Sequence, residues 1–299
     1  MSALFVALFA FSSLAYGQDN RLRKYLLGIT NGAGSSTVIN ASNYAVGTIN
    51  AYTMNTHFYQ ETRKPSANNM SYAVFDLTPP ANYMISEKDF TAQSSVVNSS
   101  GSPSSTGIRW NDPIPGGIYR ITSIAADSSM ITGFAELIYN GPVENVTVSA
   151  TVQVMSGDGT VEEVGIPAVS ACMQNLIPFF AAGDIFNDLA DKEETGIAVA
   201  NPYDFATNVT VTLYSALGSS PFGGSGLSKT IGLPAQGYVS VFIHELFPEI
   251  AQSSWFHQSQ TLSGQIRITS TTPVPTLTLK TRISGGVFKM STMPSTCGD

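Results

Sequence analysis

The feature that most constrains how this chain folds is a series of short segments in which apolar and polar residues alternate. In the segment 208–214, Val209, Val211 and Leu213 would point to one side of an extended chain and the residues between them to the other. Alternation with a period of two is typical of a β-strand with one buried face. Turn residues separate such segments at intervals of roughly 8–12 residues, a spacing typical of an all-β sandwich.

Several other segments have the same character, and each is bounded by turn residues. The segment 146–154 also alternates and is followed by Asp158-Gly159, a strong hairpin signal. This hairpin either closes a first sandwich or bridges two sandwiches. Two long loops, 91–112 and 215–228, are predicted between strands and would offer binding edges. The strands predicted for the second half are 195–200, 208–214, 227–233, 238–243 and a final pair, 264–269 and 274–283, around Thr271-Thr272-Pro273.

The first half repeats segments of the second half in the same order. Tyr119-Arg120-Ile121-Thr122-Ser123 parallels Ile266-Arg267-Ile268-Thr269-Ser270, and Thr56-His57-Phe58-Tyr59 parallels Val211-Thr212-Leu213-Tyr214. Ordered matches of this kind favour the duplication of one sandwich, and chance similarity among common β-forming segments is the alternative. We place the two domains at 18–168 and 169–299.

The first residues have the pattern of a targeting signal. Residues 4–14 form an apolar run that ends in Ala15-Tyr16-Gly17, a small-x-small pattern. The run is too short to cross a bilayer as a helix, which takes about 20 residues. We interpret residues 1–17 as a signal peptide, although no Lys or Arg precedes the run; a first buried strand or helix is the alternative. We expect no transmembrane helix in the mature chain.

The two cysteines of the chain, Cys172 and Cys297, fit an exported protein. In an oxidising compartment they would form one disulfide. Two buried free thiols are the alternative. A catalytic dithiol is disfavoured because the chain has no C-x-x-C spacing.

The composition argues against two classes of protein. Charged residues make up 12% of the 299 residues, and 14 basic side chains face 21 acidic ones, for a net charge of -7. We expect no nucleic-acid partner, because the chain offers no basic surface for phosphates. Disorder throughout the chain is not expected either, because 43% of the residues are hydrophobic and 10% are aromatic.

The motifs of common enzymes are absent from the sequence. His244-Glu245 lacks the second histidine of an H-E-x-x-H zinc site, and neither a G-x-S-x-G nor a Gly-Lys-Ser/Thr run occurs. We therefore predict that the chain is not an enzyme, that it has no catalytic residues and that it needs no organic cofactor.

Two weaker groups of candidate site residues remain. Asp184, Asp188 and Asp191 lie close in sequence and offer the hard oxygen ligands that Ca²⁺ prefers, but their spacing does not match an EF-hand loop, and a solvated acidic loop is the alternative. Trp110 and Trp255 each lie upstream of one of the paralleled strands. On a surface they would stack on a sugar or a partner, whereas the alternative is that they fill the core.

The second half also resembles a known module. The segments that carry the resemblance are IPFFAAG, TGIAVANP, NVTVTLY, LPAQGY, HELFP and GQIRITS, in this order. They are similar to immunoglobulin-like repeats in secreted and surface proteins of bacteria, well over 175–294 and only loosely in the first half. The resemblance implies a β-sandwich in an extracellular setting, and it brings no catalytic residue.

Together these features predict an all-β fold, with two tandem immunoglobulin-like β-sandwich domains after the signal peptide. The expected function is that of a non-catalytic secreted or cell-surface structural or adhesive protein. Its expected partners are surface proteins, polysaccharide or further copies of itself, reached through exposed sheet edges. The alternative is an accessory carbohydrate-binding module, calcium-dependent if the acidic cluster holds the ion.

Overall fold

The structure of the chain is a computed structural model. From residue 41 to residue 131 it describes the backbone alone. Residues 1–17, the predicted signal peptide, lie outside the described residues. The described residues are 22–31, 35–43, 52–65, 71–76, 83–90, 102–104, 107–112, 117–125, 131–139, 146–155, 159, 161–185, 191–215, 226–252, 261–293 and 295–298.

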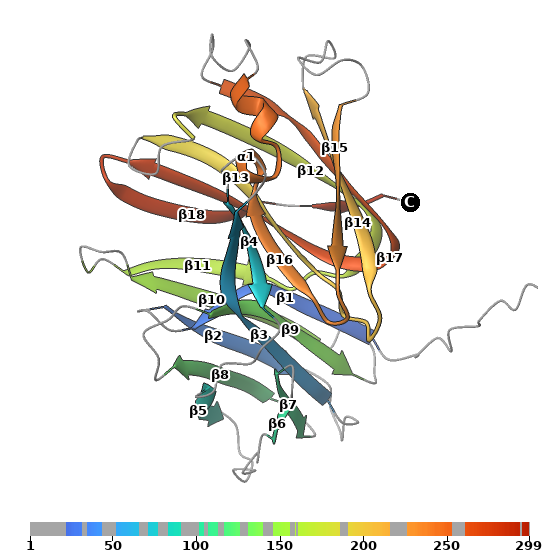
Figure 1. The fold of residues 1–299 in the computed structure, drawn as a ribbon. Helices are drawn as coiled ribbons and strands as arrows, with labels where there is room; N and C mark the ends of the chain where they lie inside the picture. Colours follow the sequence, from blue (N-terminus) through green and yellow to red (C-terminus); the bar gives the residue numbers. More distant parts are fainter. Residues whose placement is uncertain are drawn as a thin grey trace, which may run out of the picture.

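The first half of the chain forms two antiparallel sheets (Figure 1). One has the order β1-β9-β3-β7-β6, with β4 paired to β3, and the other has the order β11-β10-β2-β8-β5. The strands of the first sheet are β1 (Leu22–Asn31), β3 (Tyr52–Pro65), β4 (Ser71–Asp76), β6 (Ser102–Ser104), β7 (Gly107–Asp112) and β9 (Ile131–Tyr139). Those of the second are β2 (Ser36–Asn43), β5 (Tyr83–Phe90), β8 (Gly117–Ala125), β10 (Val146–Met155) and β11 (Val161–Pro167).

The second half forms one eight-stranded sheet, in which the strand order is β15-β14-β17-β12-β13-β16, with β18 on β17 and β19 on β12. Two short helices follow β16. These elements are β12 (Ala171–Gly183), β13 (Lys192–Ala200), β14 (Thr207–Ser215), β15 (Leu227–Leu233), β16 (Tyr238–Phe242), α1 (Ile243–Leu246), η2 (Pro248–Gln252), β17 (Thr261–Ser284), β18 (Val287–Met293) and β19 (Thr296–Cys297).

Strand β17 folds this sheet into two layers, because it changes partners along its 24 residues. It pairs with β14 up to Ser270 and with β12 up to Pro275, and it pairs with β13 from Thr276 and with β18 from Thr278. One layer is therefore β15-β14-β17-β12 and the other is β16-β13-β17-β18 (Figure 1). The change of partners falls next to Pro273 and Pro275, which lack the N–H that a central strand position donates.

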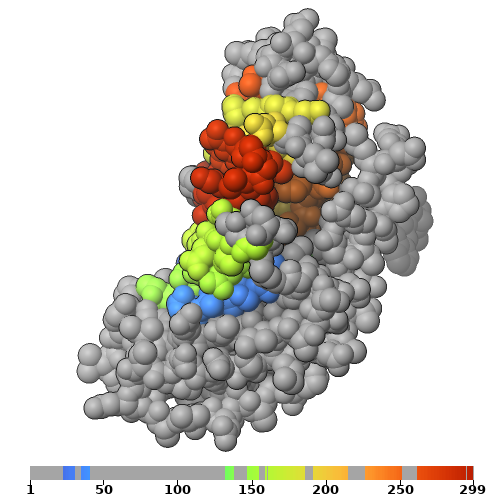
Figure 2. All heavy atoms as spheres, turned by 90° about the vertical axis from the view of Figure 1, so that its left-hand side faces the viewer, coloured from blue at the N-terminus to red at the C-terminus, as the bar shows by residue number. Residues whose placement is uncertain are grey.

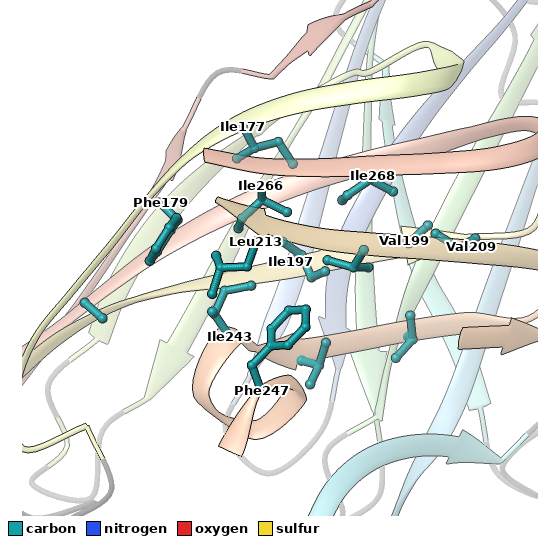
Figure 3. Packing of buried hydrophobic residues seen from close by; sticks show 14 of the residues in the cluster. Ile177, Phe179, Ile197, Val199, Val209, Leu213, Ile243, Phe247, Ile266 and Ile268 are labelled. Carbon is teal, nitrogen blue, oxygen red and sulfur yellow. The ribbon is translucent and has the colours of Figure 1, made fainter. Parts of the chain in front are cut away.

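A hydrophobic core fills the space between these two layers. Figure 3 shows Ile177, Leu213 and Ile266 from one layer facing Ile197 and Val199 from the other. The alternating side chains of β14 supply Val209, Val211 and Leu213, all fully buried, as the sequence predicts. Burial of this apolar surface is the main energy that holds the layers together, at about 25 cal/mol per Å².

A second core joins the two halves of the chain. It combines side chains of β1, β2, β9, β10 and β11 with side chains of β13, β16 and β17. Figure 2 shows the red β17–β18 region lying directly against the green β10–β11 hairpin. The buried members from the first half are Tyr25, Leu26, Leu27, Ile29, Ile39, Phe134, Ala135, Leu137, Val148, Ala150, Val152 and Ile166, and those from the second half are Ala198, Ala200, Tyr238 and Leu277.

Strand β13 is therefore buried on both faces. Ile197 and Val199 face the core between the layers, whereas Ala198 and Ala200 face the core shared with the first half. Their relative exposure does not exceed 1%. Small alanines on the second face let the sheet approach the first half closely, and the ring of Phe134 stacks on Tyr238 with centroids 6.3 Å apart.

Gly28 allows β1 to follow this junction. It has a φ of +75° at the register shift between Leu27 and Ile29, a backbone conformation that residues other than glycine rarely adopt. A Cβ at this position would contact Ile166 of the first half and Leu277 of the second at 3.8 and 3.9 Å. The bulge thus lies where the two halves meet.

Most of the predicted strands are present, with three differences. The hairpin around Asp158-Gly159 is confirmed as β10–β11; β10 pairs with β2, and β11 lies beside β18. The final pair predicted on either side of 271–273 is one continuous strand, because the chain bends there without leaving the extended conformation. The predicted loop 91–112 contains β6 and β7, and the segment 238–243 ends as a strand at Phe242. No helix in the described part of the chain is long and apolar enough to cross a membrane.

Because of Tyr238, the stability of this shared core falls at alkaline pH. Burial raises the pKa of Tyr238 to about 12, against 10.0 for a free tyrosine. The unfolded chain loses this proton first as the pH rises, so stability is full below pH 10 and falls as the pH approaches 12.

We therefore expect Tyr238→Phe to lessen the alkaline decline but not to abolish it, because burial also raises the pKa of Tyr25 in the same core. Between pH 10 and pH 12 the ionisation of Tyr238 should lower the unfolding free energy of the wild type by roughly 2–3 kcal/mol. The phenylalanine variant should not show this loss. Urea unfolding curves at a series of alkaline pH values measure the difference. Equal declines in both proteins would show that the hydroxyl does not ionise with unfolding.

Candidate functional site

The most enclosed group of charges among the described residues lies at the start of β13. Oε1 of Glu194 lies 3.4 Å from Nζ of Lys192, and Oε2 of the same carboxylate contacts Nδ1 of His244. The side chains of Glu194 and Lys192 are 4% and 7% exposed, and that of His244 is 13% exposed. A buried carboxylate is tolerated here because two basic groups flank it.

Neighbouring elements position these side chains. Glu194 and Lys192 share one face of β13, two residues apart. His244 comes from α1, whose first turn is fixed because the Phe242 N–H donates to Oε2 of Glu245 at 3.0 Å. The Phe242 ring stacks on the imidazole with centroids 6.0 Å apart. The Thr281 hydroxyl donates to the Glu194 carbonyl oxygen at 3.4 Å.

The chemistry of this group is that of a structural ion cluster. The histidine is oriented by a carboxylate, but each charge already has an internal partner. The pattern around His244-Glu245 excludes a zinc motif, but nothing in it indicates the pairing of His244 with Glu194, which lies 50 residues away. The available signal was the presence of Lys192 and Glu194 in a segment that otherwise becomes fully apolar.

We expect Glu194→Gln to lower the unfolding free energy by about 3 kcal/mol, because it leaves Lys192 buried without its counter-charge. Glu193→Gln is the matched control. Glu193 pairs with Lys280 at 2.5 Å, but that lysine is 38% exposed, so the control should lose less than about 1 kcal/mol. Chemical denaturation of both variants compares them. Equal losses would mean that burial does not distinguish the two carboxylates.

A second candidate is a depression of about 320 Å³ at the β17–β18 hairpin, lined by Arg282, Ser284, Val287 and Lys289. Arg282 and Lys289 are register partners on the two strands, so their basic groups lie on the same face. Both are exposed. The lining offers a ligand two cations, a hydroxyl and one apolar side chain.

The acidic cluster predicted for calcium is described only in part. Asp184 and Asp191 are exposed, and Asp188 lies outside the described residues. Oδ1 of Asp191 accepts a hydrogen bond from the Gly285 N–H at 2.8 Å, so this aspartate fixes the β17–β18 turn. The residues that the structure describes hold no group of three or more His, Cys, Asp or Glu suited to a metal. Since Asp188 lies outside the described residues, calcium binding stays a prediction.

Neither tryptophan side chain lies in the described part of the structure. Trp110 belongs to β7, where its backbone pairs with Met54 of β3, and its side chain lies outside the described part of the structure. Trp255 lies outside the described residues altogether. The prediction that they stack on a ligand stays a prediction.

The cysteines come together as the sequence predicts. Cys172 of β12 and Cys297 of β19 lie at disulfide distance, with their Cα atoms 5.7 Å apart. Cys172 is buried at 8% exposure, whereas Cys297 is exposed. The pair fixes the end of the described chain to a strand 125 residues earlier.

Comparisons of the chain with protein-family models, with curated proteins and with solved structures returned no match. The function is therefore inferred from this chain's own residues.

Proposed function

We propose that this chain is a non-catalytic, exported structural or adhesive protein of a cell surface. It consists of two tandem immunoglobulin-like sandwiches that follow a cleaved signal peptide, residues 1–17. The observation that carries the proposal is the core shared by the two halves, in which β13 is buried on both faces. Two sandwiches joined in this way cannot swing freely about a linker, and a stiff unit suits a scaffold that transmits force or holds a spacing.

Two further features support an extracellular role. The cysteine pair, at disulfide distance, ties β19 to β12 and would persist in an oxidising compartment. Only 12% of all residues are charged, so much of the surface consists of Ser, Thr, Asn and Gly.

Location is the first test. In cells that make the chain, a membrane-impermeant amine reagent should label it, and the N-terminus of the mature protein should be Gln18. Recovery of the chain inside the cell with residues 1–17 intact would overturn export. A membrane-impermeant reagent that labels only broken cells would have the same meaning.

Binding is the second test, and it separates the proposal from a carbohydrate-binding module. Purified mature protein is applied to a glycan array with calcium and with a chelator, beside the variants Trp110→Ala and Trp255→Ala. The structural proposal expects no glycan signal that depends on the tryptophans. Calcium-dependent glycan binding lost in these variants would favour the module instead.

A further inference from the structure

The outer edge of β12 pairs with β13 only at its end, over Ala181–Gly183, and other features close the edge next to this pairing. At Phe180 both backbone groups are satisfied by the Thr195 hydroxyl, which accepts from the N–H and donates to the carbonyl, each at 3.0 Å. Pro178 is exposed and has no N–H to offer. Natural sheets block unwanted pairing at an edge with such features.

A second short stretch of this edge is covered by a strand, β19. Cys297 and Thr296 of β19 are the register partners of Asn175 and Leu176. The Gly298 N–H donates to the carbonyl of Gln174 at 2.9 Å. The segment 295–298 therefore completes a ladder that β12 would otherwise expose.

The opposite edge of the same layer shows a different solution. On β15, Lys229 points over the ring of Phe247 at 5.8 Å and pairs with Glu249 at 3.2 Å. A charge on the inward face of an edge strand discourages a further strand from pairing there. Among the described side chains, the stretch Gln174–Leu176 has no such inward charge. Its outer edge is covered only by the segment 295–298.

We infer that the outer edge of β12 at Gln174–Leu176 is a strand-acceptor site with Cys172 as its thiol anchor. The segment 295–298 fills this site in its own chain, and the same segment of a second copy also fills it. The inference adds self-assembly to the proposed function and rests on the oxidising compartment proposed there. Its partner is a second copy of this chain.

The short connection before β19 determines the form of the exchange. Only residues 294 and 295 separate the end of β18 from β19. A link this short spans on the order of 10 Å, so exchange requires the β12 edges of two copies to face each other. Each copy then gives its segment to the other, in a closed dimer with two-fold symmetry. The segment pairs with β12 in the same way in either copy, so protein concentration decides the balance between monomer and dimer.

The disulfide step is an exchange without net oxidation. The thiolate of a small thiol such as glutathione attacks Cys297, the exposed sulfur of the pair, and Cys172 leaves as a thiolate. The Cys172 thiolate of one copy then attacks the mixed disulfide on Cys297 of the other. A new disulfide forms between the copies, and the small thiolate leaves unchanged.

Isotope mixing tests whether a second copy is accepted. Unlabelled and ¹⁵N-labelled mature protein are mixed in equal amounts at high concentration with catalytic glutathione, quenched with acid and digested without reduction. We expect disulfide-linked dimers in which about half of the Cys172–Cys297 peptide pairs carry one heavy and one light peptide, as random pairing within a closed dimer requires. Pairs of a single isotope throughout would overturn the inference, and would leave the surface location untouched.

Peptide capture tests whether strand pairing, and not thiol chemistry alone, selects the partner. The full-length variant Cys297→Ala receives a peptide of residues 293–299 whose cysteine carries a thionitrobenzoate leaving group. The Gly298→Pro peptide lacks the N–H that bonds to Gln174, whereas the Gly298→Ala peptide keeps it.

We expect Cys172 to capture the Ala peptide about three- to tenfold more effectively than the Pro peptide, the effect of one hydrogen bond. Equal capture of both peptides would overturn the inference even if isotopes mix. If the Cys297→Ala variant does not fold, the same peptides compete for wild-type protein opened by catalytic glutathione.

Discussion

Loss of the Cys172–Cys297 disulfide is expected to lower the free energy of unfolding by about 4–5 kcal/mol at most, the loop-entropy value for a closure of this length. The two cysteines are 125 residues apart, so their link restricts the unfolded chain over nearly all of the second half. Part of the loss should be local, because β19 depends on the link to stay on β12. Few other single changes in the chain should cost as much.

Urea unfolding of the wild type with and without reductant, beside the double variant Cys172→Ser/Cys297→Ser, measures this effect. The double variant should match the reduced wild type and should not respond to reductant. Each single serine variant should match the double variant, since either one removes the link. A double variant as stable as the oxidised wild type would mean that the two cysteines are not linked in solution.

Phe134→Ala is expected to cost about 3–5 kcal/mol, and its effect should reach both halves of the chain. Phe134 is fully buried, and its ring stacks on Tyr238 of the second half. Truncation would leave a cavity in the core that β9 shares with β13 and β16, and surrounding strands collapse only partly into such cavities. Amide hydrogen exchange should therefore speed up in β13 and β16 as well as in β9 and β1.

Phe179→Ala is the matched control for this effect. Phe179 is the same residue type and is 3% exposed, but it belongs to the core between the two layers of the second half. A comparable loss of stability is expected from it, with faster exchange in β12 and β14 and little change in β9. If Phe134→Ala affected the first half alone, the shared core would not couple the two halves.

The strand content could be predicted because alternation is a local property of the sequence. Val209, Val211 and Leu213 alternate with other residues, and each is buried in β14. Asp158-Gly159 likewise marked a hairpin because the turn residues and both flanking segments are close in sequence. Errors arose where the chain bends without a break, as in β17, since prolines at a bend look the same as prolines in a loop.

The candidate sites could be predicted only where few pairings were possible. Two cysteines allow one disulfide, and the structure places both at the required distance. The pairing of Glu194 with His244 had no such restriction, because any of 21 acidic residues was a partner for any basic one. Nothing in a linear pattern says which carboxylate becomes buried with which cation.

By itself, then, the sequence determined the all-β character, most strand positions and the cysteine pair. The first two follow from neighbouring residues, and two cysteines allow only one pairing. Tertiary structure alone decided that β13 is buried on both faces, that the two halves share a core, and that β19 closes the edge of β12. These features depend on contacts between segments far apart in the chain. Apolar side chains gain about as much from one apolar partner as from another, so hydrophobicity says that a face is buried but not against what.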